Sequence, residues 1–156
     1  AGEDAWRRGV YTVWKRSSPY PSFVNFDATS RTTCTVQRSR SNTPLQALTL
    51  LNDPVYVEAA AALARRTLLA RPGASDLERI QFAFQLCLTR APTAAETNLL
   101  RILLGQQREA QAAKPASAVA PTGNFAPPPG VEPAEFAAWR AVATALLNLD
   151  EMITKG

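Results

Sequence analysis

The chain has 156 residues, the size of one domain, and its 46% hydrophobic and 19% charged residues are typical of a globular protein rather than a disordered one. Histidine is absent, which excludes Ser-His-Asp and Cys-His catalysis, histidine-ligated metals and an axial histidine for haem. Two cysteines are too few for a structural zinc site, CxxCH is absent, and no apolar run is long enough to span a bilayer. Because the chain opens AGEDAW, without Met or a leader pattern, we expect a fragment of a longer protein.

The positive charge is concentrated at the N-terminal end. Residues 1–42 hold seven basic and three acidic residues (7 − 3 = +4), whereas the rest of the chain balances ten against ten. A basic segment can attract nucleic acid, an anionic polymer or an acidic partner domain. The alternative is a solvated face whose arginines pair with nearby carboxylates. The basic residues are Arg7, Arg8, Lys15, Arg16, Arg31, Arg38 and Arg40.

The N-terminal segment, 1–42, is expected to be extended. Residues 10–15, VYTVWK, alternate β-branched and aromatic residues and predict a short strand. The prolines of SSPYPSF exclude a helix interior and predict an extended turn. A second short strand is expected around residues 34–37.

The stretch SRSNTPLQALTLLNDP, residues 39–54, predicts a helix, a tight break and the start of a second helix. Thr43 and Gln46 fit a capping box, with Pro44 at the first helical position. Asp53 is then expected to cap the next helix, with Pro54 as its first residue. Each conspicuous residue of the stretch therefore has a structural role.

Three further helices follow from apolar spacing and caps. A helix over about 54–70, rich in alanine, ends at Arg71-Pro72-Gly73. Capping boxes at Ser75–Glu78 and Thr93–Glu96 begin the next two, the second of which reaches about residue 112. The expected buried faces of these two helices consist of Leu77, Ile80, Phe84, Cys87, Leu88, Leu99, Leu100, Leu103 and Leu104.

The C-terminal part divides into a linker and a last helix. Residues 113–132 are rich in Pro, Ala and Gly and predict a mobile loop or linker. Pro133 begins a helix with a strong three-four apolar pattern, over 133–156. Together these elements predict a mainly α fold: one domain over 1–156, with about five helices bundled around a core at 43–112 and a small N-terminal extended or β element.

The polar residues around the helix break are the candidate site. Arg7, Arg8, Arg38, Arg40, Asn42 and Asp53 could bind a carboxylate, a sulfate or a sugar acid. The alternative is that they cap helix ends and hold Asp27 or Asp53. Asp27 and Asp53 could also converge as a glycosidase pair must, although the sequence does not show that they do.

Aromatic residues are interleaved with the basic ones. Trp6, Tyr11, Trp14 and Tyr20 could stack on bases or sugar rings. The competing interpretation is the aromatic core of a small sheet. The two cysteines, Cys34 and Cys87, are interpreted as buried thiols, with a disulfide as the alternative in an oxidising compartment.

Four segments taken in order resemble one family: RRGVYTVWKR, FDATSRTTCTVQRSRSNTPLQALTLLNDPVYVEAAAALARR, LTRAPTAAE and AWRAVATALLNLDEM. They are similar to the C-terminal domain of unknown function of large planctomycete-type secreted proteins, which carry a cytochrome c domain near the N-terminus and a second helical domain between. The resemblance covers about residues 6–112 and 133–153. The family domain extends N-terminal of Ala1, so the chain is expected to expose a face that packs on preceding sequence.

The resemblance implies an extracytoplasmic location, periplasmic or secreted, because cytochrome c maturation takes place outside the cytoplasm. That setting favours a Cys34–Cys87 disulfide. It implies haem in an upstream domain and no cofactor in this chain. It supplies no activity and no catalytic residues to transfer.

These observations leave three functional hypotheses. The leading one is a non-catalytic structural or interaction domain that docks on other domains of its parent through Arg7, Arg8, Arg38 and Arg40. The second is part of an enzyme or binding module for extracellular polysaccharide, with acidic or sulfated saccharides as ligands. The third is nucleic-acid binding through the basic segment, which an extracytoplasmic location argues against.

Overall fold

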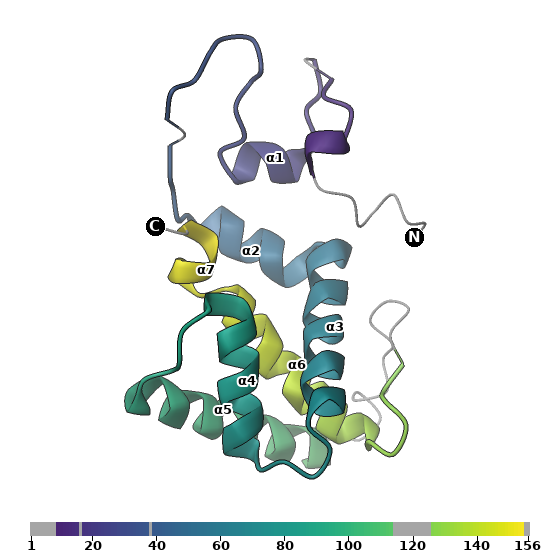
Figure 1. Ribbon diagram of the computed structural model, residues 1–156. Coiled ribbons are helices and arrows are strands. Elements are labelled where there is room, and N and C mark those ends of the chain that lie inside the picture. Colours follow the sequence, from purple (N-terminus) through teal and green to yellow (C-terminus); the bar gives the residue numbers. More distant parts are fainter. Residues whose placement is uncertain (1–8, 16, 38, 114–125, 155–156) are drawn as a thin grey trace.

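A computed structural model of the chain describes residues 9–15, 17–37, 39–113 and 126–154, and within these ranges the fold is mainly α with no strand (Figure 1). After a 3-10 turn at Gly9–Tyr11, the helices are α1 (Pro21–Asn25), α2 (Pro44–Asn52), α3 (Pro54–Ala70), α4 (Asp76–Leu88), α5 (Ala94–Ala113), α6 (Pro133–Leu147) and α7 (Asp150–Thr154). In this described part, no helix is long and apolar enough to cross a membrane.

The predicted caps place the middle helices correctly. Thr43 Oγ1 accepts from Gln46 N at 3.3 Å, and Gln46 Oε1 accepts from Thr43 N at 3.0 Å. The same reciprocal pairing begins α4 at Ser75 and α5 at Thr93. The helix break is also confirmed, because the backbone of Asp53 is extended and its carboxylate accepts from Val55 N at 2.9 Å. These bonds are local in sequence, which is why the pattern of residue types predicts them.

The predicted strands of the N-terminal segment are wrong, and the predicted extended turn ends at Tyr20, after which α1 begins. Residues 9–11 form a single 3-10 turn, and residues 34–37 are irregular. A strand needs a neighbour for its backbone donors and acceptors, and no other described segment supplies one. Pro21 does not prevent a helix, because it occupies the first position of α1, where its missing N–H costs nothing.

Helix α6 is the centre of the core, and it packs most extensively against α3 and α5 (Figure 1). Trp139, Val142 and Leu146 of α6 are almost completely buried. The alanines of α3 pack in the same cluster, which lets the two backbones approach closely, as the alanine-rich sequence predicts. Two residues expected in buried faces are exposed instead: Leu77 lies in the first turn of α4, and Leu99 lies on the outer side of α5.

The C-terminal end adds an element that the pattern did not predict. The chain turns at Asn148 and forms the short helix α7, whose Met152 packs against the core cluster. Of the predicted linker, residues 114–125 lie outside the described ranges. Its described end packs on the helical body: Arg65 donates to the carbonyl of Ala126 at 2.9 Å, and Val131 packs against the core.

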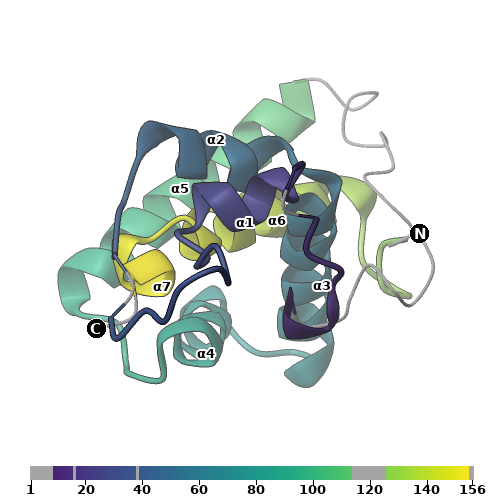
Figure 2. The same cartoon turned by 90° about the horizontal axis from the view of Figure 1, so that it is seen from above.

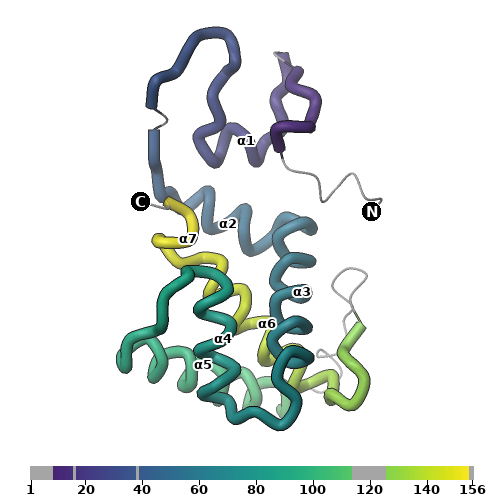
Figure 3. The backbone as a smooth tube through the Cα atoms, viewed as in Figure 1, coloured from purple at the N-terminus to yellow at the C-terminus, as the bar shows by residue number. Residues whose placement is uncertain are grey.

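The N-terminal segment lies on one end of this body. Figure 3 follows the chain from the 3-10 turn through α1 and along a long excursion back to α2. Seen from above in Figure 2, the excursion passes beside α7 before it enters α2. Residues far apart in the sequence, 36–37, 39–41 and 153–154, therefore line one hollow.

Candidate functional site

Three of the four predicted docking arginines lie outside the part of the chain that the structure describes. Arg7, Arg8 and Arg38 lie outside the described residues, so the predicted arginine face stays a prediction. Arg40 is described and exposed, and no hydrogen bond or ion pair joins it to another residue of the described ranges. Arg40 is therefore available to an external group.

Asp53 has a structural role. Besides capping α3, its carboxylate accepts from Ser22 Oγ of α1 at 3.4 Å. It also lies close enough to Tyr56 that, together with burial as the larger cause, its negative charge raises the pKa of that phenol. Asp53 thus joins α1, α2 and α3 at one point.

Asn42 also ties elements together. Its amide donates to Asp150 Oδ1 at 2.6 Å, which fastens the loop before α2 to the first turn of α7. Asp27 and Asp53 are held by different partners, Asp27 by Ser41 and Asp53 by the cap of α3.

A buried glutamine organises the region between α1 and α2. Gln46 is 1% exposed, and its amide nitrogen donates to Asn25 O at 2.6 Å and to Ser41 Oγ at 3.0 Å. Ser41 must then donate its own hydroxyl proton onward, and it does so to Asp27 Oδ2 at 2.6 Å. The result is a directed chain of hydrogen bonds from Gln46 through Ser41 to Asp27. The sequence pattern predicts only the capping role of Gln46, because its other partners are 5 and 21 residues away.

Asp27 is held in an unusual backbone conformation. Its φ is 55°, in the left-handed region that Asp tolerates better than most residues. Its Oδ2 also accepts from Ser41 N at 3.0 Å, which fixes the carboxylate across the base of the excursion. Two hollows of about 480 and 450 Å³ meet at this point, and Asp27 and Ser39 line both of them.

The two cysteines are not joined by a disulfide. Cys87 is buried in the core, as its place in the apolar stripe of α4 predicts. Cys34 is exposed in the irregular excursion, so neither the disulfide nor the interpretation of both as buried thiols describes this structure. Within the described ranges, no group of three or more possible metal ligands exists either.

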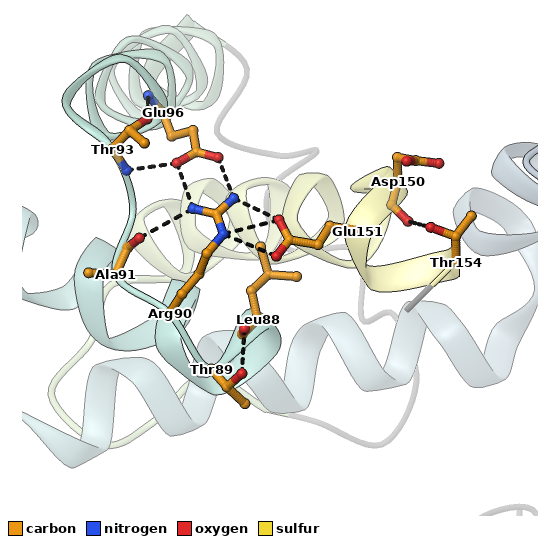
Figure 4. Close-up of polar contacts among 9 residues, drawn as sticks. All are labelled: Leu88, Thr89, Arg90, Ala91, Thr93, Glu96, Asp150, Glu151 and Thr154. Atoms are coloured by element: carbon orange, nitrogen blue, oxygen red, sulfur yellow. Dashed lines mark hydrogen bonds and ion pairs between the residues drawn. The ribbon is translucent and has the colours of Figure 1, made fainter. Parts of the chain in front are cut away.

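Two arginine-centred clusters bind the helical body together. Arg90, which follows α4, pairs with Glu96 of α5 and with Glu151 of α7, at 2.7 Å in each case (Figure 4). The Arg90 guanidinium, with a smaller contribution from the Thr93 N–H, lowers the pKa of Glu96 to about 2. Every charged group in this cluster has a partner within the cluster. The cluster therefore joins helices and does not form a binding site.

The second cluster lies at the other end of α4. Arg108 of α5 pairs with Asp76 and with Glu135, at 2.6 Å in each case. Glu135 also accepts from Trp139 Nε1 at 2.8 Å. Hydrogen bonding to Arg108 lowers the pKa of both carboxyls, which stay ionised at neutral pH.

Exposed apolar side chains gather in the first third of the chain. Nine of the thirteen exposed large hydrophobic residues in the described part lie between Val10 and Leu51. By contrast, eighteen of its nineteen buried hydrophobic residues lie at Ala60 or beyond. The nine are Val10, Tyr11, Val13, Tyr20, Val24, Val36, Leu45, Leu48 and Leu51, and we call them the N-terminal apolar set.

A family model matches residues 1–104, two thirds of the chain, and its description is PSD1, protein of unknown function (DUF1553). The chain belongs to this family. The match contains the N-terminal apolar set, the helix break and α4, and it ends within α5. The C-terminal segment of the expected resemblance, 133–153, lies outside the match. No curated protein and no solved structure matches the chain.

Proposed function

We propose that this chain is a non-catalytic interaction domain that docks on another domain of its parent protein. The observation that carries the proposal is the N-terminal apolar set, which stays exposed although the rest of the chain builds a compact core. Leu45, Leu48 and Leu51 of α2 are 54%, 57% and 51% exposed. Three half-exposed leucines on one short helix are more typical of an interface than of a free surface.

The charge of the segment favours an acidic partner. Residues 1–42 carry the whole net charge of +4, and the remainder of the chain is balanced. A partner with an apolar centre and an acidic rim would complement both properties of the segment. We propose that the partner is a domain of the same polypeptide that lies upstream, together with a haem domain, in an extracytoplasmic compartment, as the family resemblance implies.

The chain itself does not fit a haem. It has no histidine and no CxxCH, and its single methionine, Met152, packs against the core. The proposal therefore assigns any haem to another domain and gives this chain no redox step.

The test is binding in trans between this chain and the rest of the parent protein, produced separately. The double variant Leu45→Ser/Leu48→Ser should weaken that binding by at least about tenfold, since each leucine loses roughly 1–2 kcal/mol of apolar burial at the interface. Leu99→Ser is the matched control, because Leu99 is 67% exposed on α5 and lies outside the N-terminal apolar set. Equal binding by the double variant and the unmodified chain would overturn the proposal.

A further inference from the structure

We infer that the two hollows around Asp27 form a binding groove for an anionic saccharide. This inference rests on the residues around Asp27 and not on the leucines of α2, although two members of the N-terminal apolar set, Val24 and Val36, also line the hollows. It rests on four properties of the groove: an oriented acceptor, an available cation, a wall rich in hydroxyl groups and a suitable volume.

The acceptor is the carboxylate of Asp27. Its Oδ2 is occupied by the two bonds from Ser41, whereas its Oδ1 accepts no hydrogen bond from any residue in the described ranges. The chain from Gln46 through Ser41 holds the carboxylate in one orientation before a ligand arrives. An acceptor that is fixed in advance binds a hydroxyl donor at a lower entropic cost than a free side chain does.

The cation is Arg40. It lines the hollow that also contains Asp27, and it directly follows Ser39, which lines both hollows. Because Arg40 has no ion pair within the described residues, its guanidinium can receive a carboxylate or a sulfate in a two-point contact. Asp27 would repel a simple anion, so the ligand must also bring hydroxyl donors.

The walls match the surface of a sugar. Seven of the eighteen residues that line the two hollows carry hydroxyl groups, which both donate and accept hydrogen bonds, as sugar hydroxyls do. Trp14 and Val24 provide apolar wall on one side of Asp27, and Phe26 and Ile153 provide it on the other. The hydroxyl residues that line the two hollows are Thr29, Ser30, Thr32, Thr35, Ser39, Ser41 and Thr154.

The size of the groove favours more than one sugar ring. Each hollow, about 480 and 450 Å³, lies within the range of small-ligand sites. Since Asp27 and Ser39 line both, one ligand can extend from the first hollow into the second. The inferred ligand is therefore an oligosaccharide that carries a carboxylate or a sulfate on the ring next to Arg40.

The experiment is calorimetric titration of the purified chain with trigalacturonate, with its methyl-esterified form, with a sulfated galactose trisaccharide and with inorganic sulfate. An anionic trisaccharide should bind at least tenfold more tightly than the methyl ester, and the tighter of the two anionic sugars identifies the anion. Arg40→Ala and Asp27→Asn should each weaken its binding at least tenfold, whereas Arg40→Lys should retain part of it. Asp27→Asn preserves an acceptor for Ser41, so it should remain folded.

The control variant is Arg66→Ala, which removes the same charge from an exposed position on α3 and should leave the affinity unchanged. If inorganic sulfate binds as tightly as the anionic sugars, the groove recognises an anion alone, and the inference is overturned. Absence of binding by both anionic sugars, or equal loss in Arg40→Ala and Arg66→Ala, would overturn it as well.

Discussion

At the scale of single residues, the structure uses its polar groups mainly to join segments. Gln46 is the clearest case, because one buried amide serves a helix cap, the end of α1 and the loop before α2. The cap follows from the spacing of Thr43 and Gln46. The other two bonds depend on how α1 folds back over α2, which no local pattern encodes. Sequence therefore identifies Gln46 as a structural residue but not the region that it organises.

The lowered pKa of Glu96 makes the stability of the body dependent on acid. Arg90 holds this pKa at about 2, below the usual value of 4.5, so the unfolded chain binds the proton more readily than the folded chain. The free energy of unfolding should therefore fall as pH decreases from about 4.5 to about 2. The effect should be modest and should shrink in high salt, because the pair is partly exposed.

Glu96→Gln tests this dependence by urea unfolding across that pH range. The variant should be less stable than the unmodified chain at pH 7, and the difference between the two should disappear near pH 2. Asp76, Glu135 and Glu151 also have lowered pKa values and will keep part of the slope. A difference that persists undiminished at pH 2 would contradict the assigned role of Arg90.

At the scale of elements, the helix break at Asp53 fixes the change of direction between α2 and α3. Its carboxylate caps α3 and receives Ser22 of α1, so one side chain fixes three helices. Asp53→Ala should lower the free energy of unfolding by about 1–2 kcal/mol, the usual loss for an N-cap. Thermal or urea unfolding measures this change.

Asp53→Asn is the matched control for the cap. Asparagine retains an oxygen for Val55 N and can still accept from Ser22, so its stability should stay within about 0.5 kcal/mol of the unmodified chain. If both variants lose equal stability, the negative charge rather than the capping bond is responsible, and the role assigned to Asp53 is wrong.

The helices divide into those that sequence predicts and those that it does not. Helices α2 to α6 have a cap, a proline at the first turn or a long apolar repeat, and all five are predicted. Helices α1 and α7 have only five residues each, too few for a periodic pattern. The contacts that hold α7, from Asn42 and Arg90, span 108 and 61 residues and follow only from the folded structure.

At the scale of the whole molecule, the chain combines a well-packed body with an N-terminal segment that buries little apolar surface of its own. In the described part before Ala60, Leu50 is the one buried large hydrophobic residue. The family match includes this segment, so it belongs to the domain. The predicted site on Arg7, Arg8 and Arg38 stays a prediction. The hollow beside Asp27 forms because the excursion returns beside α7, a contact that no local sequence pattern encodes.

The central claim is that residues 9–52 dock on another domain of the parent protein. Hydrogen–deuterium exchange tests it most directly, with this chain alone compared with the full-length product of its gene. The account predicts slower exchange across residues 9–52, α2 above all, in the full-length protein, with little change in α4 and α6. Identical exchange of residues 9–52 in the two proteins would contradict the claim.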